Sequence, residues 1–190
     1  MKHWPLIVLL CVPALTLADT APTHNSTIAN SGSSYSGALS VNQAAGDMQQ
    51  QSNARALAVG SGANAAIVQK QDIQIDGLDS VMNTSAAIQG SAFSNGNGAL
   101  GVNQSAGAAT QQVNAMSISV GTGVESIDDS VLAQSIAVSG ISGAGESATG
   151  ERRVVTDDSA FGGSRGVVQL NQSAGVGNRM ANSLSIRVVE

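Results

Sequence analysis

The chain has 190 residues, of which 11% are charged and only 2% aromatic, and its net charge is −5. The hydrophobic fraction of 42% is largely Ala and Val, which each bury little apolar surface, so a conventional core of large side chains is not expected. The low charge is not typical of a disordered chain. The acidic balance and the scarcity of aromatic residues argue against nucleic-acid binding.

The first eighteen residues have the features of a secretory signal peptide. Lys2 precedes an apolar stretch over residues 6–15, and small residues lead to an expected cleavage site after Ala18. The apolar stretch is too short to cross a membrane. Cys11 is the only cysteine and would leave with the leader, so the mature chain would have no disulfide. We expect export to the periplasm and then to the cell exterior.

The segment 19–36 is polar and is expected to be a disordered tail. It contains His24, the only histidine outside the leader. No proline follows Pro22, and the remaining sequence is rich in Asn, Gln, Ser, Ala and Gly. A long stretch of this kind with little charge is typical of cross-β structure.

A unit of 24 residues then occurs three times, over 37–60, 98–121 and 166–189. The second copy reads GALGVNQSAGAATQQVNAMSISVG, and the other two align with it without gaps at offsets of 61 and 68 residues. Apolar and polar residues alternate in both halves of the unit, which predicts two strands. A turn between the two strands is predicted at a glycine, because glycine reaches positive φ without steric cost. The turn glycines of the three copies are Gly46, Gly107 and Gly175. The unit is therefore a β-arch or hairpin, which becomes stable when copies stack.

Amide side chains occupy the same places in every copy. Copies stacked at the strand spacing of about 4.8 Å would let each amide donate to one neighbour and accept from the other. The alternative is that these residues only serve turns. The constant spacing of 11 residues between the two Asn positions (42 to 53, 103 to 114, 171 to 182) favours ladders. The three predicted ladders are Asn42/Asn103/Asn171, Gln43/Gln104/Gln172 and Asn53/Asn114/Asn182.

The linkers 61–97 and 122–165 are less regular, and either add further rungs to a solenoid or loop out. They contain β-like pieces such as 66–75 and echo one another. The echoes are Ser80–Ser85 with Ser130–Ser135, and Ser91–Phe93 with Ser159–Phe161. The predicted fold is all-β: a stacked β-arch or β-solenoid of three imperfect repeats, competent to form amyloid.

The sequence offers no machinery for catalysis. Once the leader is gone it has no cysteine, and His24 is too isolated to activate a nucleophile. We therefore expect no enzyme activity, no cofactor, no metal and no small-molecule substrate. The pairs Asp128-Asp129 and Asp157-Asp158 could bind Ca²⁺ loosely but lack a calcium-binding repeat pattern, so solvated loops that limit aggregation are preferred. Copy-specific arginines are expected to slow assembly or fix its register, or only to add solubility: Arg55, Arg179 and Arg187.

The repeat pattern V-N-Q-[AS]-A-G followed by Q-x-N-x-x-[AS]-[LI]-[AS] resembles the repeats of the Fap functional amyloids of Gram-negative bacteria and, more loosely, those of curlin. The small size and short linkers resemble FapB, the minor, nucleating fibre subunit. The C-terminal CxxC pair associated with Fap subunits is missing, because the chain ends Ile186-Arg-Val-Val-Glu190. The resemblance implies a biofilm fibre, with a major fibre subunit, an outer-membrane export pore and the biofilm matrix as partners.

Two other functions are open from the sequence: a monomeric β-solenoid adhesin with capped ends, and an accessory chaperone that holds fibre subunits by mimicking their repeats. Only the polar tail precedes the first repeat, and the third runs almost to the last residue. Uncapped strand edges favour a self-assembling fibre subunit over a monomer.

Overall fold

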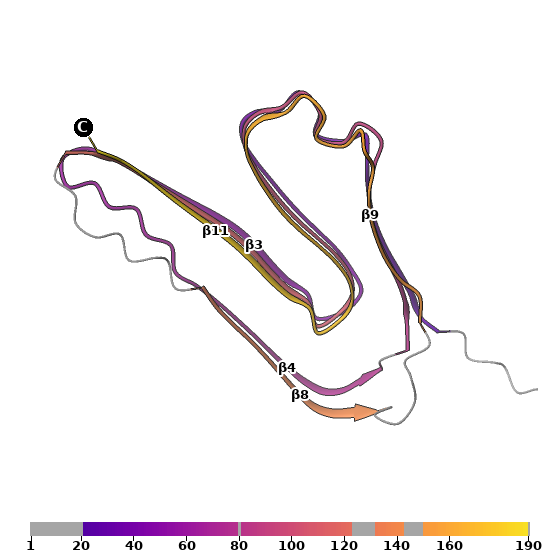
Figure 1. Ribbon diagram of the computed structural model, residues 1–190. Coiled ribbons are helices and arrows are strands. Elements are labelled where there is room, and N and C mark those ends of the chain that lie inside the picture. Colours follow the sequence, from indigo (N-terminus) through magenta and orange to yellow (C-terminus); the bar gives the residue numbers. More distant parts are fainter. Residues whose placement is uncertain (1–20, 80, 123–131, 143–149, 190) are drawn as a thin grey trace, which may run out of the picture.

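The computed structural model describes residues 21–79, 81–122, 132–142 and 150–189 (Figure 1). The expected leader, 1–18, lies outside the described residues, as do Asp128 and Asp129. All the secondary-structure elements in the described part of the chain are β-strands. None of its elements is a helix long and apolar enough to span a bilayer.

The strands form three successive turns of the chain, which we call rungs. The first rung holds β1 (Thr23–Ala29), β2 (Ser36–Ala45), β3 (Gln50–Val59) and β4 (Gln69–Asp79). The second holds β5 (Asn83–Gln89), β6 (Asn97–Ala108), β7 (Gln111–Gly121) and β8 (Leu132–Ser142). The third holds β9 (Arg152–Thr156), β10 (Arg165–Val176) and β11 (Arg179–Val189).

Each strand pairs in parallel with its counterpart in the neighbouring rung. The resulting sheets are β1-β5-β9, β2-β6-β10, β3-β7-β11 and β4-β8, here named A, B, C and D in that order. In sheet B, Asn42 pairs with Asn103 and Asn103 with Asn171, so the strand register keeps the offsets of the sequence repeat. Seen along the stack, the three rungs overlay one another (Figure 1). The predicted all-β stacked fold is confirmed.

Side chains join the sheets in the order A, B, C, D. Successive residues of a strand point to opposite faces, so on β6 the amide of Gln104 reaches Ala87 O of sheet A at 2.9 Å. The amide of its neighbour Asn103 instead lies against sheet C. Sheet D joins sheet C where Gln71 Nε2 donates to Gln112 O at 3.3 Å. Strands β2 and β3 belong to different sheets, so the repeat unit is a β-arch and not a hairpin.

The second rung forms the centre of the molecule because it has a rung on either side. Between sheets A and B the core contains Ile88, Phe93, Leu100 and Val102, all at most 1% exposed. Residues 81–122 and 132–142, the described part of this rung, include no Asp, Glu, Lys, Arg or His. In β5, β6 and β7, a charge would face a strand about 4.8 Å away on each side with little access to water, which is costly.

The expectation of a disordered tail over 19–36 is wrong for residues 23–29, which form β1. Ser26 and Ile28 are 2% and 6% exposed and point toward sheet B. Ser26 Oγ donates to Gln43 Oε1 at 3.0 Å. One buried isoleucine in a polar segment is a weak sequence signal, and pairing with β5 outweighs the low strand tendency of the segment.

The linkers neither loop out as a whole nor add rungs. They supply β4, β5, β8 and β9, which complete the same rungs as the repeats. One echo has a structural meaning: the rings of Phe93 and Phe161 stack with centroids 5.4 Å apart. The other does not, because residues 83–85 lie in sheet A and residues 132–135 in sheet D.

Candidate functional site: the amide ladders

The first ladder lies on the face of sheet B that meets sheet C. Asn103 Nδ2 donates to Asn42 Oδ1, and Asn171 Nδ2 donates to Asn103 Oδ1, both at 2.9 Å. Asn103 and Asn171 are 0% and 2% exposed. A buried amide without partners would be destabilising, so the continuous chain of bonds is what allows these residues to be interior.

The second asparagine ladder faces the first from sheet C. Asn114 Nδ2 donates to Asn53 Oδ1 at 2.9 Å, and Asn182 Nδ2 donates to Asn114 Oδ1 at 3.0 Å. Within each rung the two ladders are also joined, by bonds of 2.7 to 3.0 Å: Asn53 to Asn42, Asn114 to Asn103 and Asn182 to Asn171. The spacing of 11 residues is thus the length of arch that brings two amides face to face across the layer.

The glutamine ladder lies on the opposite face of sheet B, toward sheet A. Gln104 Nε2 donates to Gln43 Oε1 at 3.0 Å, and Gln172 Nε2 donates to Gln104 Oε1 at 2.9 Å. The same nitrogens also donate to backbone carbonyls of sheet A, as Gln172 does to Val155 O at 2.9 Å. This ladder therefore fastens sheets A and B together as well as holding the rungs in line.

The direction of the bonds is fixed by the backbone. Asn114 Nδ2 donates to Val102 O at 3.1 Å and Asn182 Nδ2 to Leu170 O at 3.0 Å. A carbonyl oxygen can only accept a hydrogen bond, so the amide nitrogen must be the atom that points there. All three ladders consequently donate in one direction, from the third rung to the second and from the second to the first.

The sequence comparison missed two shorter ladders. Gln111 Nε2 donates to Gln50 Oε1 at 3.2 Å, and Gln51 Nε2 donates, in the opposite direction, to Gln112 Oε1 at 2.9 Å. The third copy has Arg179 and Met180 at these places, so a search for residues shared by all three copies passes over them. Agreement between the first two copies alone was the available signal.

The turn glycines lie where the chain passes from sheet B to sheet C. Gly46, Gly107 and Gly175 have φ of 106°, 126° and 115°, which side chains rarely adopt. A Cβ on Gly46 would lie 2.0 Å from Gly107 O, and one on Gly107 would lie 2.0 Å from Gly175 O. Glycine is thus needed both for the conformation and for the close stacking of turns.

Arg55 occupies a different environment from Arg179 and Arg187, which are exposed. Its guanidinium lies between sheets B and C and donates to Leu39 O at 2.6 Å and Ser40 Oγ at 2.8 Å. Burial lowers its pKa from the ordinary value. The second and third copies have Met116 and Leu184 at this position.

Asp157 has a local structural contact. Its carboxylate accepts from Ser159 N at 2.9 Å and from Ser159 Oγ at 2.7 Å, and these bonds lower its pKa. In the described part of the chain, no three His, Cys, Asp or Glu residues gather as metal ligands.

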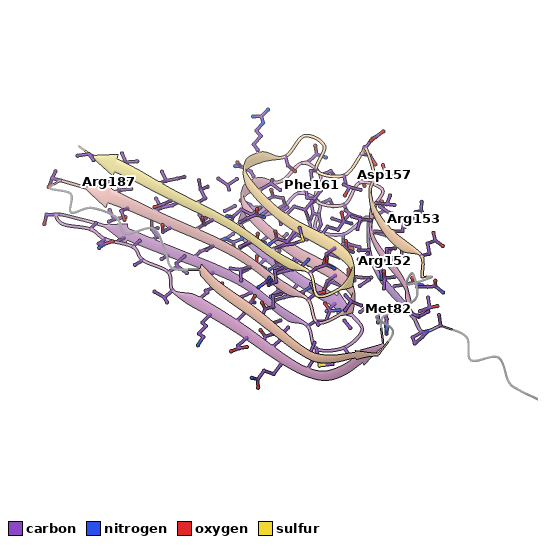
Figure 2. The ribbon with its side chains drawn as sticks, turned by 60° about the horizontal axis from the view of Figure 1, so that its bottom comes forward. Met82, Arg152, Arg153, Asp157, Phe161 and Arg187 are labelled. Carbon is purple, nitrogen blue, oxygen red and sulfur yellow. The ribbon has the colours of Figure 1, made fainter. Side chains whose placement is uncertain are left out.

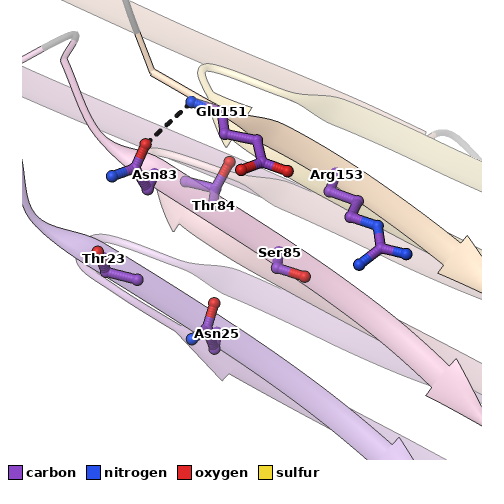
Figure 3. A pocket seen from close by; sticks show the side chains of 7 residues that line it. All are labelled: Thr23, Asn25, Asn83, Thr84, Ser85, Glu151 and Arg153. Atoms are coloured by element: carbon purple, nitrogen blue, oxygen red, sulfur yellow. Dashed lines mark hydrogen bonds between the residues drawn. The ribbon is translucent and has the colours of Figure 1, made fainter.

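A shallow polar pocket of about 390 Å³ lies on sheet A (Figure 3). Glu151 N donates to Asn83 Oδ1 at 3.0 Å there, joining β9 to β5. The other lining side chains are Thr, Asn, Ser and one arginine, Arg153. None of these lining residues is a histidine or a cysteine, and the bond between Glu151 and Asn83 joins the third rung to the second.

The chain was compared with known families and structures. The model of the functional amyloid protein FapB/FapC family matches residues 14–189. No solved structure matches the chain. The family match spans the three repeats, both linkers and the buried amide ladders described above. The chain belongs to the functional amyloid protein FapB/FapC family, a family of structural amyloid proteins.

Proposed function

We propose that this chain is exported and assembles outside the cell into functional amyloid fibres that support a biofilm, as a nucleating rather than a bulk subunit. The observation that carries the proposal is the set of three amide ladders, which run through every rung and end at both outer faces of the stack. A ladder gains stability with each added rung, because its bonds polarise one another and each addition satisfies further buried amides.

Family membership supports assembly into fibres, and the leader-like first eighteen residues support export. The nucleating role is favoured by the short linkers, which supply strands β4, β5, β8 and β9 to the stack. A chain whose linkers already pair as strands can act as a preformed template. Partners would be a major fibre subunit and an outer-membrane export pore.

The direct test is incubation of the purified chain. We expect thioflavin-positive fibrils with cross-β reflections near 4.8 Å and 10 Å. A chain that stays monomeric and dye-negative would contradict the proposal. For the nucleating role, small amounts of its fibrils should shorten the lag of the major subunit, and seeds that leave that lag unchanged would exclude it.

Export is tested separately. The N-terminus of the secreted chain should begin at Asp19, and deletion of residues 6–15 should keep the chain in the cytoplasm. Secretion of the deleted form would show that the leader assignment is wrong.

A further inference from the structure

We propose that the two outer faces of the rung stack are a donor face and an acceptor face, so that the first rung of one copy docks only on the third rung of another and the fibre is polar. This inference rests on the proposed function. It adds the partner, a second copy of this chain, together with its orientation and register.

The first-rung face presents amide N–H groups. In the second rung, Asn103 Nδ2 donates to Ser52 O of the rung before it at 2.9 Å. In the third rung, Asn171 Nδ2 likewise donates to Val113 O at 2.9 Å. Asn42 holds the same place in the first rung, and in the described structure its bonds use only its oxygen. Its amide group is thus oriented to donate into a rung that this chain does not contain.

The third-rung face presents amide oxygens. Asn103 Oδ1 accepts two bonds, one from Asn114 in its own rung and one from Asn171 in the rung after it. Asn171 Oδ1 accepts only the bond from Asn182 within its own rung. One acceptor position therefore remains on Asn171, on the side where another rung would lie.

Two columns of glycine run through the stack to its outer faces. A Cβ on Gly98 or Gly166 would lie 2.0 Å from the carbonyl oxygen of the glycine one rung earlier. Gly37 continues this column to the first-rung face, where its Cβ would meet nothing within 4 Å. In the turn column, Gly175 reaches the third-rung face, where the side chain of Arg152 lies 2.9 Å from the Cβ position. The first-rung face is therefore open to another backbone at Gly37, and the third-rung face becomes open at Gly175 when the Arg152 side chain moves aside.

The register follows from the internal offsets, since 61 + 68 = 129. In sheets B and C, a third-rung residue of one copy should therefore lie beside the residue 129 positions earlier in the next copy: Asn171 by Asn42, Asn182 by Asn53 and Gly166 by Gly37. The edges of β10 and β11 that would receive the next copy form the outer face of the stack seen from the side in Figure 2. Docking of two like faces would set donors against donors or acceptors against acceptors.

Cysteine cross-linking tests orientation and register together. Ser36 and Arg165 both pair with Asn97 and both are exposed. Within one chain they are two strand spacings apart, about 9.6 Å, beyond disulfide reach, but across the proposed joint they are about 4.8 Å apart. Ser36→Cys and Arg165→Cys are made in separate chains that also carry Cys11→Ser, and the two are mixed and assembled.

Oxidised fibrils should contain mostly the mixed 36–165 dimer, at least tenfold over either like dimer. A matched pair that is out of register, Ser36→Cys with Arg187→Cys, should cross-link at least tenfold less. Fibrils with mainly 36–36 or 165–165 dimers, or with no preference, would overturn the inference while leaving fibre formation intact. Failure to form fibrils would instead contradict the proposed function and, with it, this inference.

A glycine substitution provides a second, independent test. Gly37 and Gly62 have φ of 86° and 70°, and neither would place a Cβ within 4 Å of another atom in the single chain. Alanine should therefore strain the soluble chain similarly at both places. Only Gly37→Ala should clash at the joint, raising the concentration of chain left in solution beside fibrils by roughly tenfold or more over Gly62→Ala. Equal values for the two variants would contradict the proposed joint.

Discussion

Ladder asparagines of the second rung are buried on all sides and bonded in three directions. Asn103 is 0% exposed and Asn114 is 1% exposed, and each contacts the rung before, the rung after and the facing sheet. The sequence identifies these residues because their chemistry repeats at fixed offsets. It does not identify Gln51 and Gln112, since the third copy breaks the pattern with Met180.

We expect the double substitution Asn103→Ala and Asn114→Ala to destabilise the fibre strongly. It removes the donor to Asn53 Oδ1 and one donor each to Asn42 Oδ1, Ser52 O and Val102 O, at roughly 1–3 kcal/mol for each buried group left unsatisfied. The check is the guanidinium concentration that dissolves half of the fibrils. The control is Asn25→Ala with Asn64→Ala, both at exposed positions, which should change stability by less than about 0.5 kcal/mol each. If guanidinium dissolves the fibrils of both double variants at the same concentration, the ladders do not stabilise the fibre.

Arg55 is the residue most in conflict with the proposed joint. There its guanidinium would lie between Met116 of its own copy and Leu184 of the neighbour, with no carboxylate added. Burial of a charge is costly unless it is paired. We expect Arg55→Leu to lower the concentration of chain left in solution beside fibrils by roughly threefold to tenfold. Arg187→Leu, at an exposed position, is the control for loss of charge alone. A higher soluble concentration for Arg55→Leu would show that Arg55 stabilises the joint.

At the scale of elements, the three arches follow from period-two alternation and a glycine turn, and they were predictable. The strands of the linkers were not. β1 and β5 share little sequence yet pair over seven residues, because their inward side chains complete a core supplied by sheet B. Internal repetition reveals a strand only where side chains repeat, whereas backbone pairing needs no such likeness.

If β5 is integral to the stack, Ile88→Ala should be costly. Ile88 is 0% exposed in the core between sheets A and B, so we expect a loss of about 2–5 kcal/mol. Val154→Ala on β9, where the side chain is 49% exposed, should lose less than about 1 kcal/mol. Denaturant unfolding of the soluble chain measures both. A negligible effect at Ile88 would mean that the linker strand is dispensable.

At the scale of the whole molecule, differences in length fall between strands and not within them. The offset is 60 where β1 pairs with β5, 61 where β3 pairs with β7, 63 where β4 pairs with β8, and 68 where β5 pairs with β9. The extra residues lie in the β5–β6 connection and in the connections before and after β8. A ladder joins only residues that lie in register. The connections between strands can therefore differ in length while the strands of the rungs stay in register.

An insertion should therefore be tolerated in one place and not in another. Six Gly/Ser residues added after residue 145, between β8 and β9, should leave fibril formation within about twofold of the unaltered chain. The same residues added after Gly101 would divide β6 and shift Asn103 out of line with both Asn42 and Asn171, and should abolish assembly. Loss of fibrils in both cases would show that the connection is part of the rung.

The tolerance of this connection sets a limit on what a fibre of these copies can carry. In the proposed fibre each copy adds three rungs, or about 14 Å of length, so equivalent points of successive copies recur at that interval. A grafted peptide of a few residues fits that interval. A folded domain about 30 Å across does not. A decorated filament could hold such a domain on only one copy in two or three, with plain copies mixed in as spacers.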